Sequence, residues 1–464
     1  MNPEAIRYAQ QGAEAQEQGR LQEALEFYLK AVAIDVTLSG LASNLGVVLT
    51  DLGAFDKAEQ VFKEAIRVDA SNPAVWNNRG NLWKKQKVWN RALDDYSTAL
   101  QLKADYVNAW YNRGTVHFAL NQLTEAENDL QEALNLDPFF AKAWVNLGEV
   151  RWELNRGEDA MRCFESAIAS DEENAEAHWN RSLWYLWKGD YQKGWPEYEW
   201  RWALPGILPF YSELPLWRGE EEVHLLVYAE QGYGDTIQFS RFLREVKKRV
   251  RTLTVDVQDS LLPWLRSFYP EIEFVGSSGF PKTVTHRVAL QSLPLVLGIE
   301  SPRNQDSQRT SLQTKNEKIR QIGFCWTGSE VDLRRRCLLE LWKPLFDLPG
   351  IEWVSFQAGR VTQELKTISH SIEDWGSGFQ NFQETAEALQ KVDLVITIDT
   401  ALAHLAGTIG KPTWILLPHV ADWRWGESGD RCDWYESVRC FRQSTRGDWA
   451  DVIERVRCEF QKQN

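Results

Sequence analysis

A glycine recurs every 34 residues through the first third of the chain, and this period constrains the fold more than any other feature. Two alanine positions keep the same spacing, with no insertion or deletion between repeats. Small residues at three fixed places indicate two antiparallel helices that cross closely, since larger side chains would push the pair apart. The series are Gly12, Gly46, Gly80, Gly114 and Gly148; Ala24, Ala58, Ala92, Ala126 and Ala160; and Ala31, Ala65, Ala99, Ala133 and Ala167.

A period of 34 residues is typical of tetratricopeptide (TPR) repeats, whose helix pairs stack into a solenoid. Repeats begin near residues 5, 39, 73, 107 and 141, and a sixth begins near residue 175. The sixth has Ser182 in place of the glycine and Gly194 in place of the alanine, as expected of a capping unit. A solenoid offers a curved groove to a partner and brings no chemistry of its own, so any reaction is expected after about residue 200.

Composition narrows the classes of partner and site. Residues 1–205 hold 21 Lys plus Arg against 31 Asp plus Glu, most of the chain's net charge of −14, which argues against nucleic acid as a partner. The six cysteines form no CxxC pair and no cluster with His, so we expect no metal site, no disulfide framework and a cytoplasmic location. No apolar stretch is long enough to predict a signal peptide or a membrane span.

One amide per repeat stands two residues before the glycine position. A carboxamide donates and accepts, so a row of amides on the first helices can pair with the backbone of an extended peptide. The row resembles that of O-linked N-acetylglucosamine transferase, whose TPR groove holds polypeptide through such asparagines. The alternative is that these are structural TPR residues that satisfy neighbouring backbone groups. The predicted acceptor-binding residues are Asn44, Asn78, Asn112, Asn146 and Asn180, with Gln10 in the first repeat.

Prolines at 205, 209 and 215 interrupt the helical pattern, and strands then alternate with helices, which indicates parallel α/β sheets. The polar stretch 301–318 is interpreted as a hinge between two Rossmann-like lobes that leave a cleft between them. We therefore predict a TPR solenoid at 1–205, a first lobe at 206–305 and a second lobe at 306–464. Strands are predicted at 223–229, 252–257, 272–275, 322–326, 353–357, 394–398 and 414–417, and helices at about 235–248 and 259–267.

The first of three loops with a chemical signal is EQGYGDTIQFSRFL at 230–243. Gly232 and Gly234 allow backbone N–H groups to face an anion at a helix start, with Asp235 at the cleft edge. Alternatively, Asp235 caps the helix through Thr236 and Gln238.

In the second loop, Asp399 and Thr400 open a helix that contains His404. The helix N–H groups and the Thr400 hydroxyl suit a diphosphate, and His404 lies one turn later on the same face, where it can donate to a phosphate oxygen. Alternatively, Asp399 is an N-cap and His404 a buried histidine with satisfied hydrogen bonds.

The third loop, WTGSEVDLRRRC at 326–337, places Thr327 before three consecutive arginines. An arginine can grip a phosphate with two parallel hydrogen bonds, and Arg336 is the preferred candidate of the three. The alternative is a solvated charged face.

In this order, the loops resemble those of the heptosyltransferase-type glycosyltransferases (glycosyltransferase family nine), in the bacterial form fused to TPR repeats. The similarity runs from about Asp190 to the end of the chain. The resemblance implies a GT-B fold, a nucleotide-diphosphate sugar as co-substrate without another cofactor, and metal-independent inversion at the anomeric carbon. The matching segments are GDYQKGWPEYEWRW, EQGYGDTIQFSRFL, LQSLPLVLGI, DTALAHLAG, KPTWILLP, ADWRW and FRQSTRGDW.

By this resemblance, Asp235 matches the general base that takes the acceptor's proton. The third loop departs from the family pattern, because Arg336-Cys337 replaces an arginine-serine pair and Glu330 replaces Asn or Pro. The predicted donor-binding residues are Gly232, Gly234, Thr236, Thr327, Arg336, Asp399, Thr400 and His404.

We therefore expect a glycosyltransferase that acts on an acceptor presented by the TPR groove, with a polypeptide as the expected acceptor. Two alternatives stay open: a non-catalytic adaptor that retains the fold, and a transferase for a surface polysaccharide or lipid-linked glycan. Trp423 and Trp425 are expected to pack in the core rather than stack on a sugar.

Overall fold

The computed structural model describes residues 3–34, 39–277, 283–302, 319–328 and 333–463. The chain forms two compact units, Met1–Ala177 (the TPR unit) and His178–Asn464 (the α/β unit). The predicted boundary at 205/206 differs from this division and stays a prediction. The predicted boundary at 305/306 and most of the predicted hinge lie in 303–318, outside the described residues.

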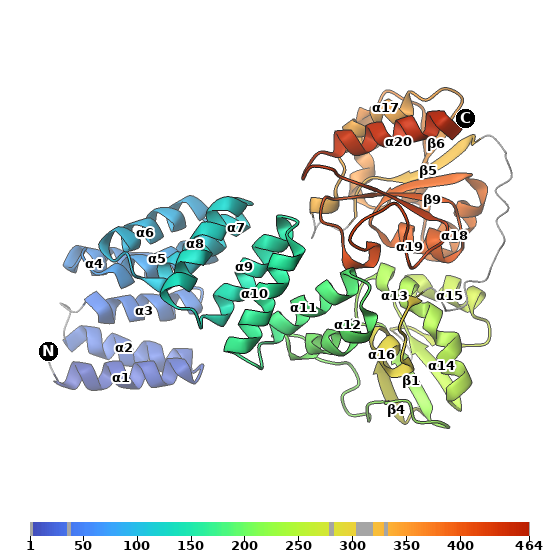
Figure 1. Cartoon of the computed structure of the whole chain (residues 1–464). Helices are drawn as coiled ribbons and strands as arrows, with labels where there is room; N and C mark the ends of the chain where they lie inside the picture. The colour runs from blue at the N-terminus through green and yellow to red at the C-terminus, as the bar shows by residue number, and fades with distance from the viewer. Residues whose placement is uncertain (1–2, 35–38, 278–282, 303–318, 329–332, 464) are drawn as a thin grey trace. The chain divides into compact units, whose positions relative to one another are not determined.

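The TPR unit consists of antiparallel helix pairs in the predicted register (Figure 1). A sixth pair follows, which falls almost wholly within the residue range of the α/β unit, and its second helix is short and contains Pro196. This arrangement confirms the predicted N-terminal helical solenoid. The pairs are α1 (Pro3–Glu17) and α2 (Leu21–Ile34), α3 (Ser39–Asp51) and α4 (Phe55–Val68), α5 (Pro73–Lys85) and α6 (Trp89–Leu102), α7 (Val107–Ala119) and α8 (Leu123–Leu136), α9 (Ala141–Glu153) and α10 (Gly157–Ser170), and α11 (Ala175–Trp187) and α12 (Tyr191–Tyr198).

Close helix crossing explains the glycine period. A Cβ atom at Gly148 would lie 2.4 Å from the Phe164 ring, and one at Gly80 would lie 2.5 Å from the Tyr96 ring. The repeating alanines are fully buried where the paired helices meet. The small residues therefore set the distance between the two helices of a repeat, as the sequence predicted.

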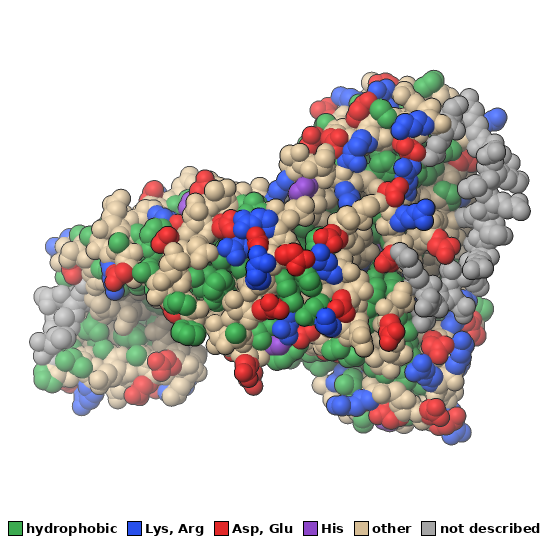
Figure 2. Space-filling model, in the orientation of Figure 1, with side chains coloured by type: hydrophobic (Ala, Val, Ile, Leu, Met, Phe, Trp, Pro, Cys, Tyr) green, Lys and Arg blue, Asp and Glu red, His purple; other side chains and the backbone are tan. Residues whose placement is uncertain are grey.

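Charged side chains on the TPR unit neutralise one another across repeats. Glu127 of α8 pairs with Arg151 at 3.0 Å and with Arg156 at 2.8 Å, and Arg156 also pairs with Asp159 at 2.8 Å. Figure 2 shows side chains of both signs interspersed over α8, α9 and α10. Arg156 is exposed, whereas Glu127 and Arg151 are half-buried, so solvent screens the pairs of Arg156 more strongly.

The α/β unit contains two sheets in which every strand pairing is parallel, which confirms the predicted α/β architecture. The four-stranded sheet has the order β3-β2-β1-β4 and the six-stranded sheet the order β10-β9-β8-β5-β6-β7. The strands are β1 (His224–Tyr228), β2 (Thr252–Asp256), β3 (Glu273–Val275), β4 (His286–Ala289), β5 (Gln321–Cys325), β6 (Glu352–Ser355), β7 (Ile372–Asp374), β8 (Leu394–Ile398), β9 (Thr413–Leu417) and β10 (Val438–Arg442).

Three strands, β4, β7 and β10, were not predicted, and all three lie at the edge of a sheet. An edge strand contacts one neighbour and tolerates charged residues, so it lacks the continuous apolar run that marks a central strand. β7, with the sequence IED, has no buried residue. In contrast, every residue of the central strand β8 is buried.

Helices of the two sheets meet where the strands end. α13 (Tyr233–Phe239) packs against α19 (Ala401–Thr408), and α15 (Leu262–Phe268) packs against α18 (Phe382–Lys391). In Figure 1, α17 (Lys343–Phe346) and α20 (Trp449–Gln463) lie on the other side of the six-stranded sheet. The predicted helix at 235–248 is two helices, α13 and α14 (Leu243–Arg249), joined by a 3-10 turn. α16 (Leu293–Leu297) follows β4.

Across the described residues, no helix is both long enough and apolar enough to cross a bilayer.

The crossing geometry predicts that Gly148→Ala lowers the local stability of α9 and α10 by about 1–2 kcal/mol. Overpacking costs about 1–3 kcal/mol, and the better helix propensity of alanine offsets up to about 1 kcal/mol of this. Hydrogen exchange of the amides in the whole chain measures the loss.

Gly114→Ala is the matched control. Its Cβ would lie 3.0 Å from Leu130 Cγ, and a leucine side chain can adjust more readily than an aromatic ring. A loss in α7 and α8 as large as that caused by Gly148→Ala would contradict the argument.

Candidate functional site

A cavity of about 700 Å³ lies in the α/β unit at the carboxyl ends of the strands. Residues that follow β1, β2, β5, β6, β8 and β9 line it, so both sheets contribute. Parallel sheets bind ligands at this edge, and the volume suits a nucleotide-sized molecule. The cavity is therefore the candidate functional site.

Seven of the nine residues predicted for catalysis and donor binding line this cavity, and two do not. Thr236 is buried, and its hydroxyl donates to Gln258 Oε1 at 3.0 Å. Arg336 pairs with Glu364, outside the cavity. The seven are Gly232, Gly234, Asp235, Thr327, Asp399, Thr400 and His404.

Arg335 lines the cavity in place of Arg336, which was the preferred arginine of the third loop. Arg335 lies 3.3 Å from the Asp399 carboxylate. The 3-10 turn Leu333–Arg335 sets which of the consecutive arginines faces the cavity. Sequence spacing alone does not determine that direction. Glu330 lies outside the described residues.

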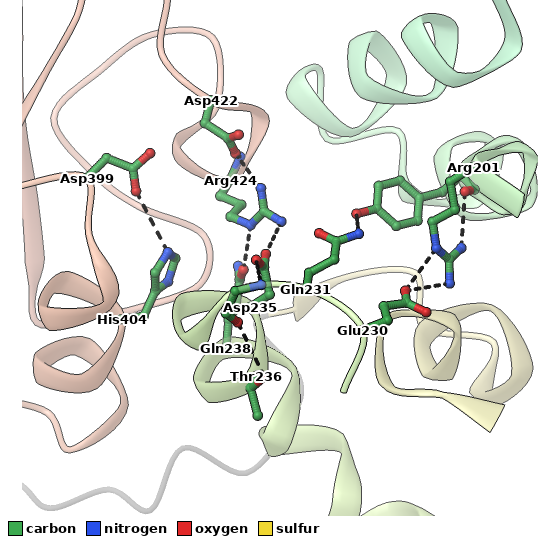
Figure 3. A network of polar contacts seen from close by, with 12 residues as sticks. Arg201, Glu230, Gln231, Asp235, Thr236, Gln238, Asp399, His404, Asp422 and Arg424 are labelled. Atoms are coloured by element: carbon green, nitrogen blue, oxygen red, sulfur yellow. Dashed lines mark hydrogen bonds and ion pairs between the residues drawn. The ribbon is translucent and has the colours of Figure 1, made fainter. Parts of the chain in front are cut away.

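Both oxygens of the Asp235 carboxylate have partners (Figure 3). Oδ2 accepts from the backbone N–H of Gly232 at 3.1 Å, which caps α13, and Oδ1 pairs with the Arg424 guanidinium. The predicted capping through Thr236 and Gln238 is therefore replaced by capping through Gly232. A carboxylate has about four lone-pair sites, so each oxygen can still accept from a ligand hydroxyl.

Arg424 links the segment of the cavity wall that follows β9 to the segment that follows β1. Besides Asp235, it donates to Gln238 Oε1 of α13 at 2.9 Å and to Asp422 at 2.8 Å. Figure 3 shows the guanidinium between the carboxylates of Asp422 and Asp235. Three partners on two segments fix its plane, because a guanidinium donates in a rigid fork.

The tryptophans on either side of Arg424 are buried, as the sequence predicted, and they also hold Arg424 in place. The Trp423 ring lies 4.5 Å from the Arg424 guanidinium and 5.8 Å from the Trp195 ring. The Trp425 ring stacks on His404, with the ring centroids 5.2 Å apart. The segment from Asp422 to Trp425 is therefore held on both sides, and Arg424 projects from it to Asp235.

The loop that carries Asp235 is also fixed from the side away from Arg424. The buried Arg201 donates to Glu230 Oε1 at 2.9 Å, and Gln231 Nε2 donates to the Tyr198 hydroxyl at 3.3 Å (Figure 3). Burial raises the pKa of Glu230 to about 7, although Arg201 opposes the rise. These contacts hold the start of the loop in place.

Burial controls the charges of Asp399 and His404. It raises the pKa of Asp399 to about 6, with the Asp422 carboxylate adding to the rise and Arg335 opposing it. It lowers the pKa of His404 to about 3, and Arg424 lowers that pKa further. His404 is therefore neutral at neutral pH, with a single N–H to donate.

The contacts of His404 indicate which nitrogen carries that proton. Nδ1 lies 2.9 Å from the Tyr435 hydroxyl, and Nε2 lies 3.8 Å from Asp399 Oδ1. An ionised carboxylate only accepts, so the arrangement favours a proton on Nε2 and donation by Tyr435 to Nδ1. The predicted role of His404 as a donor is compatible with this tautomer.

The N-terminus of α19 opens onto the cavity. Thr400 is the N-cap, its side chain makes no capping hydrogen bond, and its hydroxyl lies 3.3 Å from that of Thr397. Ala401 and Leu402, in the first turn, also line the cavity. Unpaired N–H groups in the first turn of a helix favour an anion.

The described part of the chain contains no group of three or more His, Cys, Asp or Glu side chains arranged to hold a metal ion.

In the TPR unit, the predicted asparagine row lies on the first helices, and several of its members bridge neighbouring repeats. Asn78 donates to Ser43 Oγ at 3.0 Å, Asn112 to Asn77 Oδ1 at 3.0 Å, and Asn146 to the Tyr111 hydroxyl at 3.3 Å. Asn44 is exposed and Asn180 half-buried. The amides therefore have a structural role, and each bridging amide keeps a second N–H. Binding of an acceptor by these residues stays a prediction.

Three residues that line the cavity were not among the predicted site residues: Arg335, Asp422 and Arg424. Asp422 and Arg424 follow β9, so the rule that ligands bind beyond strand ends would have selected them if it had been applied to this strand. Arg424 was considered only as the residue between two tryptophans.

Comparisons with known proteins identify the repeats. Tetratricopeptide repeat models match residues 39–68, 107–140 and 145–198. Protein FlbA of Caulobacter vibrioides is 24% identical over 334 residues, which cover 62% of this chain and 55% of FlbA. The chain therefore spans about half the length of this curated relative. The chain contains TPR repeats and has a distant similarity to FlbA.

Several solved structures are also similar. PilF of Pseudomonas aeruginosa is 18% identical with a TM-score of 0.40, over 44% of this chain and 93% of that chain. Cut9, in a complex with Hcn1, is 19% identical with a TM-score of 0.41, over 44% and 41%. YrrB, described as a TPR protein with an unusual peptide-binding site, is 20% identical with a TM-score of 0.32, over 38% and 91%.

Asp399→Asn should stabilise the α/β unit above pH 6 by about 2–3 kcal/mol. Folding raises the Asp399 pKa from 3.8 to about 6, so its contribution to stability is present below 3.8 and is lost as the pH rises through 6. Asparagine removes the buried charge. The difference in the free energy of unfolding between Asp399→Asn and the unaltered protein should decrease as the pH falls from 6 to 4.

Thermal unfolding of both proteins across this pH range measures the difference. A difference that does not change with pH would show that the Asp399 pKa is not raised in the folded state.

Proposed function

We propose that the α/β unit binds a nucleotide-diphosphate sugar in its cavity and transfers the sugar to a hydroxyl of an acceptor held by the TPR repeats. The proposed acceptor is a polypeptide, and the proposed fold is GT-B. The observation that carries the proposal is one cavity at the carboxyl ends of both sheets. It contains the Asp235 carboxylate, the neutral His404 and the open N-terminus of α19.

A diphosphate needs positive charge, and the cavity offers it from several elements. Arg335 and Arg424 line it together with the first turn of α19. Three carboxylates oppose them, but the Asp399 pKa of about 6 means that this residue can take up a proton when an anion binds. Helix N–H groups and arginines together can stabilise the leaving diphosphate.

The chemistry proposed for Asp235 is proton removal from the acceptor. As the acceptor oxygen bonds to the anomeric carbon, the bond from that carbon to the donor phosphate breaks and the nucleoside diphosphate leaves. The proton passes to Asp235 and later to solvent. The ion pair with Arg424 holds the Asp235 carboxylate in a fixed orientation. Inversion follows from a single displacement.

A non-catalytic scaffold is the second candidate, and the comparisons favour it more directly, because the matching family models describe TPR repeats only. TPR solenoids present extended surfaces to polypeptides. The α/β unit would then bind a ligand, or none, without transferring a sugar. Transfer to a polysaccharide would need the same cavity and a different acceptor.

Arg335→Gln should weaken binding of the cognate nucleotide sugar by about tenfold or more, because it removes a charge-assisted partner of the diphosphate. Calorimetric titration with a panel of UDP-, GDP-, ADP- and dTDP-sugars measures the affinity. Arg336→Gln is the control. Arg336 is the next residue but pairs with Glu364 outside the cavity, so no change is expected. Equal losses in the two variants would place the diphosphate elsewhere.

Asp235→Asn should reduce transfer by at least about 100-fold while donor binding stays within a few-fold, because an amide keeps the shape but cannot take the proton. Asp422→Asn is the matched control, because it removes another carboxylate from Arg424 without removing the proposed base. Radiolabelled sugar transfer to acceptor protein measures the rate.

Comparable losses in both variants would mean that Asp235 acts only through Arg424. If the unaltered protein binds a nucleotide sugar and transfers nothing to any acceptor, the scaffold is the better account.

A further inference from the structure

A chain of hydrogen bonds on the first helices of the TPR unit begins at Lys84. Lys84 Nζ donates to Asn112 Oδ1 at 3.0 Å and to Thr115 Oγ1 at 3.4 Å. Asn112 Nδ2 then donates to Asn77 Oδ1 at 3.0 Å. Asn77 Nδ2 donates to Asn78 Oδ1 at 3.2 Å, and Asn78 Nδ2 donates to Ser43 Oγ at 3.0 Å. This series of hydrogen bonds extends over three repeats, from α7 through α5 to α3.

Lys84 sets which way each side-chain amide in this series of hydrogen bonds is oriented. An ammonium group has three N–H donors and no acceptor, so Asn112 must turn its oxygen toward Lys84 and its NH₂ group toward Asn77. The same constraint passes on to Asn77 and Asn78. All three amide oxygens are therefore already used as acceptors, and what remains on this face is mainly N–H groups.

Lys84 differs from the residues at the same position of the other repeats, which are Gln16, Thr50, Phe118, Trp152 and Leu186. It is half-buried, and among the described residues no carboxylate lies within ion-pair distance of it. Burial lowers the Lys84 pKa, and no charged neighbour contributes to the shift. Its two acceptors are neutral, and one N–H is left over.

A partly desolvated ammonium held by neutral oxygens gains from a carboxylate, because the ion pair compensates the lost hydration better than neutral acceptors do. The amide row continues beyond Lys84 in both directions, to Asn44 on one side and Asn146 on the other. A bound segment that follows this row would pass Lys84 rather than end there. The fitting carboxylate is therefore on a side chain.

We propose that the TPR unit binds an extended internal segment of an acidic polypeptide, with an Asp or Glu side chain paired to Lys84 and backbone carbonyls facing the amide N–H groups. This inference rests on the proposed role of the repeats as a polypeptide-binding surface. The acidic balance of the TPR unit as a whole opposes attraction at long range, so Lys84 selects one position in the segment.

The test uses the whole chain and an array of 12-residue peptides, each made once with an amidated and once with a free C-terminus. Each peptide that contains Asp or Glu is paired with a twin that carries Asn or Gln instead. We expect binders whose twins bind about tenfold or more weakly. Lys84→Gln, which keeps an N–H donor for Asn112 and removes the charge, should abolish that difference, and Lys84→Arg should restore most of it.

Lys85→Gln is the control, because Lys85 is adjacent and already pairs with Asp51 at 3.2 Å. It should leave the difference intact. Equal melting temperatures exclude misfolding as the cause of any loss, and a variant that melts early is replaced by Lys84→Met.

Acidic peptides and twins that bind equally well would overturn the role of Lys84 and leave polypeptide binding intact. Binding that requires a free C-terminus would also overturn it, in favour of a terminal carboxylate. If no peptide binds the unaltered chain, the proposed polypeptide-binding role of the repeats fails as well.

Discussion

The ion pair between Arg424 and Asp235 is the contact on which the cavity of the α/β unit depends. Asp235 follows β1, an interior strand of one sheet, and Arg424 follows β9 of the other sheet, so the ion pair joins the two sheets. Arg424 can reach because Trp423 packs against Trp195 and Trp425 stacks on His404. Both side chains of this pair are half-buried, so misplacing either partner leaves a partly desolvated charge without its counter-ion.

Close backbone approach complements the ion pair. A Cβ atom at Gly234 would lie 2.8 Å from the His404 ring, so α13 and α19 come together only because this position is glycine. The glycine that the sequence analysis assigned to anion binding therefore also permits helix packing. His404, Asp399 and the N-terminus of α19 are brought to the same cavity as Asp235 by this contact.

In the TPR unit, residues that recur from repeat to repeat hold the helices together, and a residue that occurs in only one repeat gives the surface a local charge. Glycines and alanines at fixed spacing allow the helices to cross, and the asparagines bridge neighbouring repeats. Lys84 breaks the pattern at one position and orients the amides around it. A repeating surface becomes selective in this way, because a single charge distinguishes one register of a bound chain from the others.

Residue patterns along the chain were enough to predict the helix pairs, the central strands and most of the loops that form the cavity. Periodicity and apolar runs report local burial, and strand ends of parallel sheets meet at one edge, so Asp235, Asp399 and His404 could be placed together. The strands β4, β7 and β10 were not predicted because charged residues interrupt their short apolar runs. Two features could not be predicted in this way: Arg335 rather than Arg336 faces the cavity, and Arg424 pairs with a carboxylate 189 residues earlier in the chain. Partners so distant are chosen by packing between elements, and no local pattern encodes that packing.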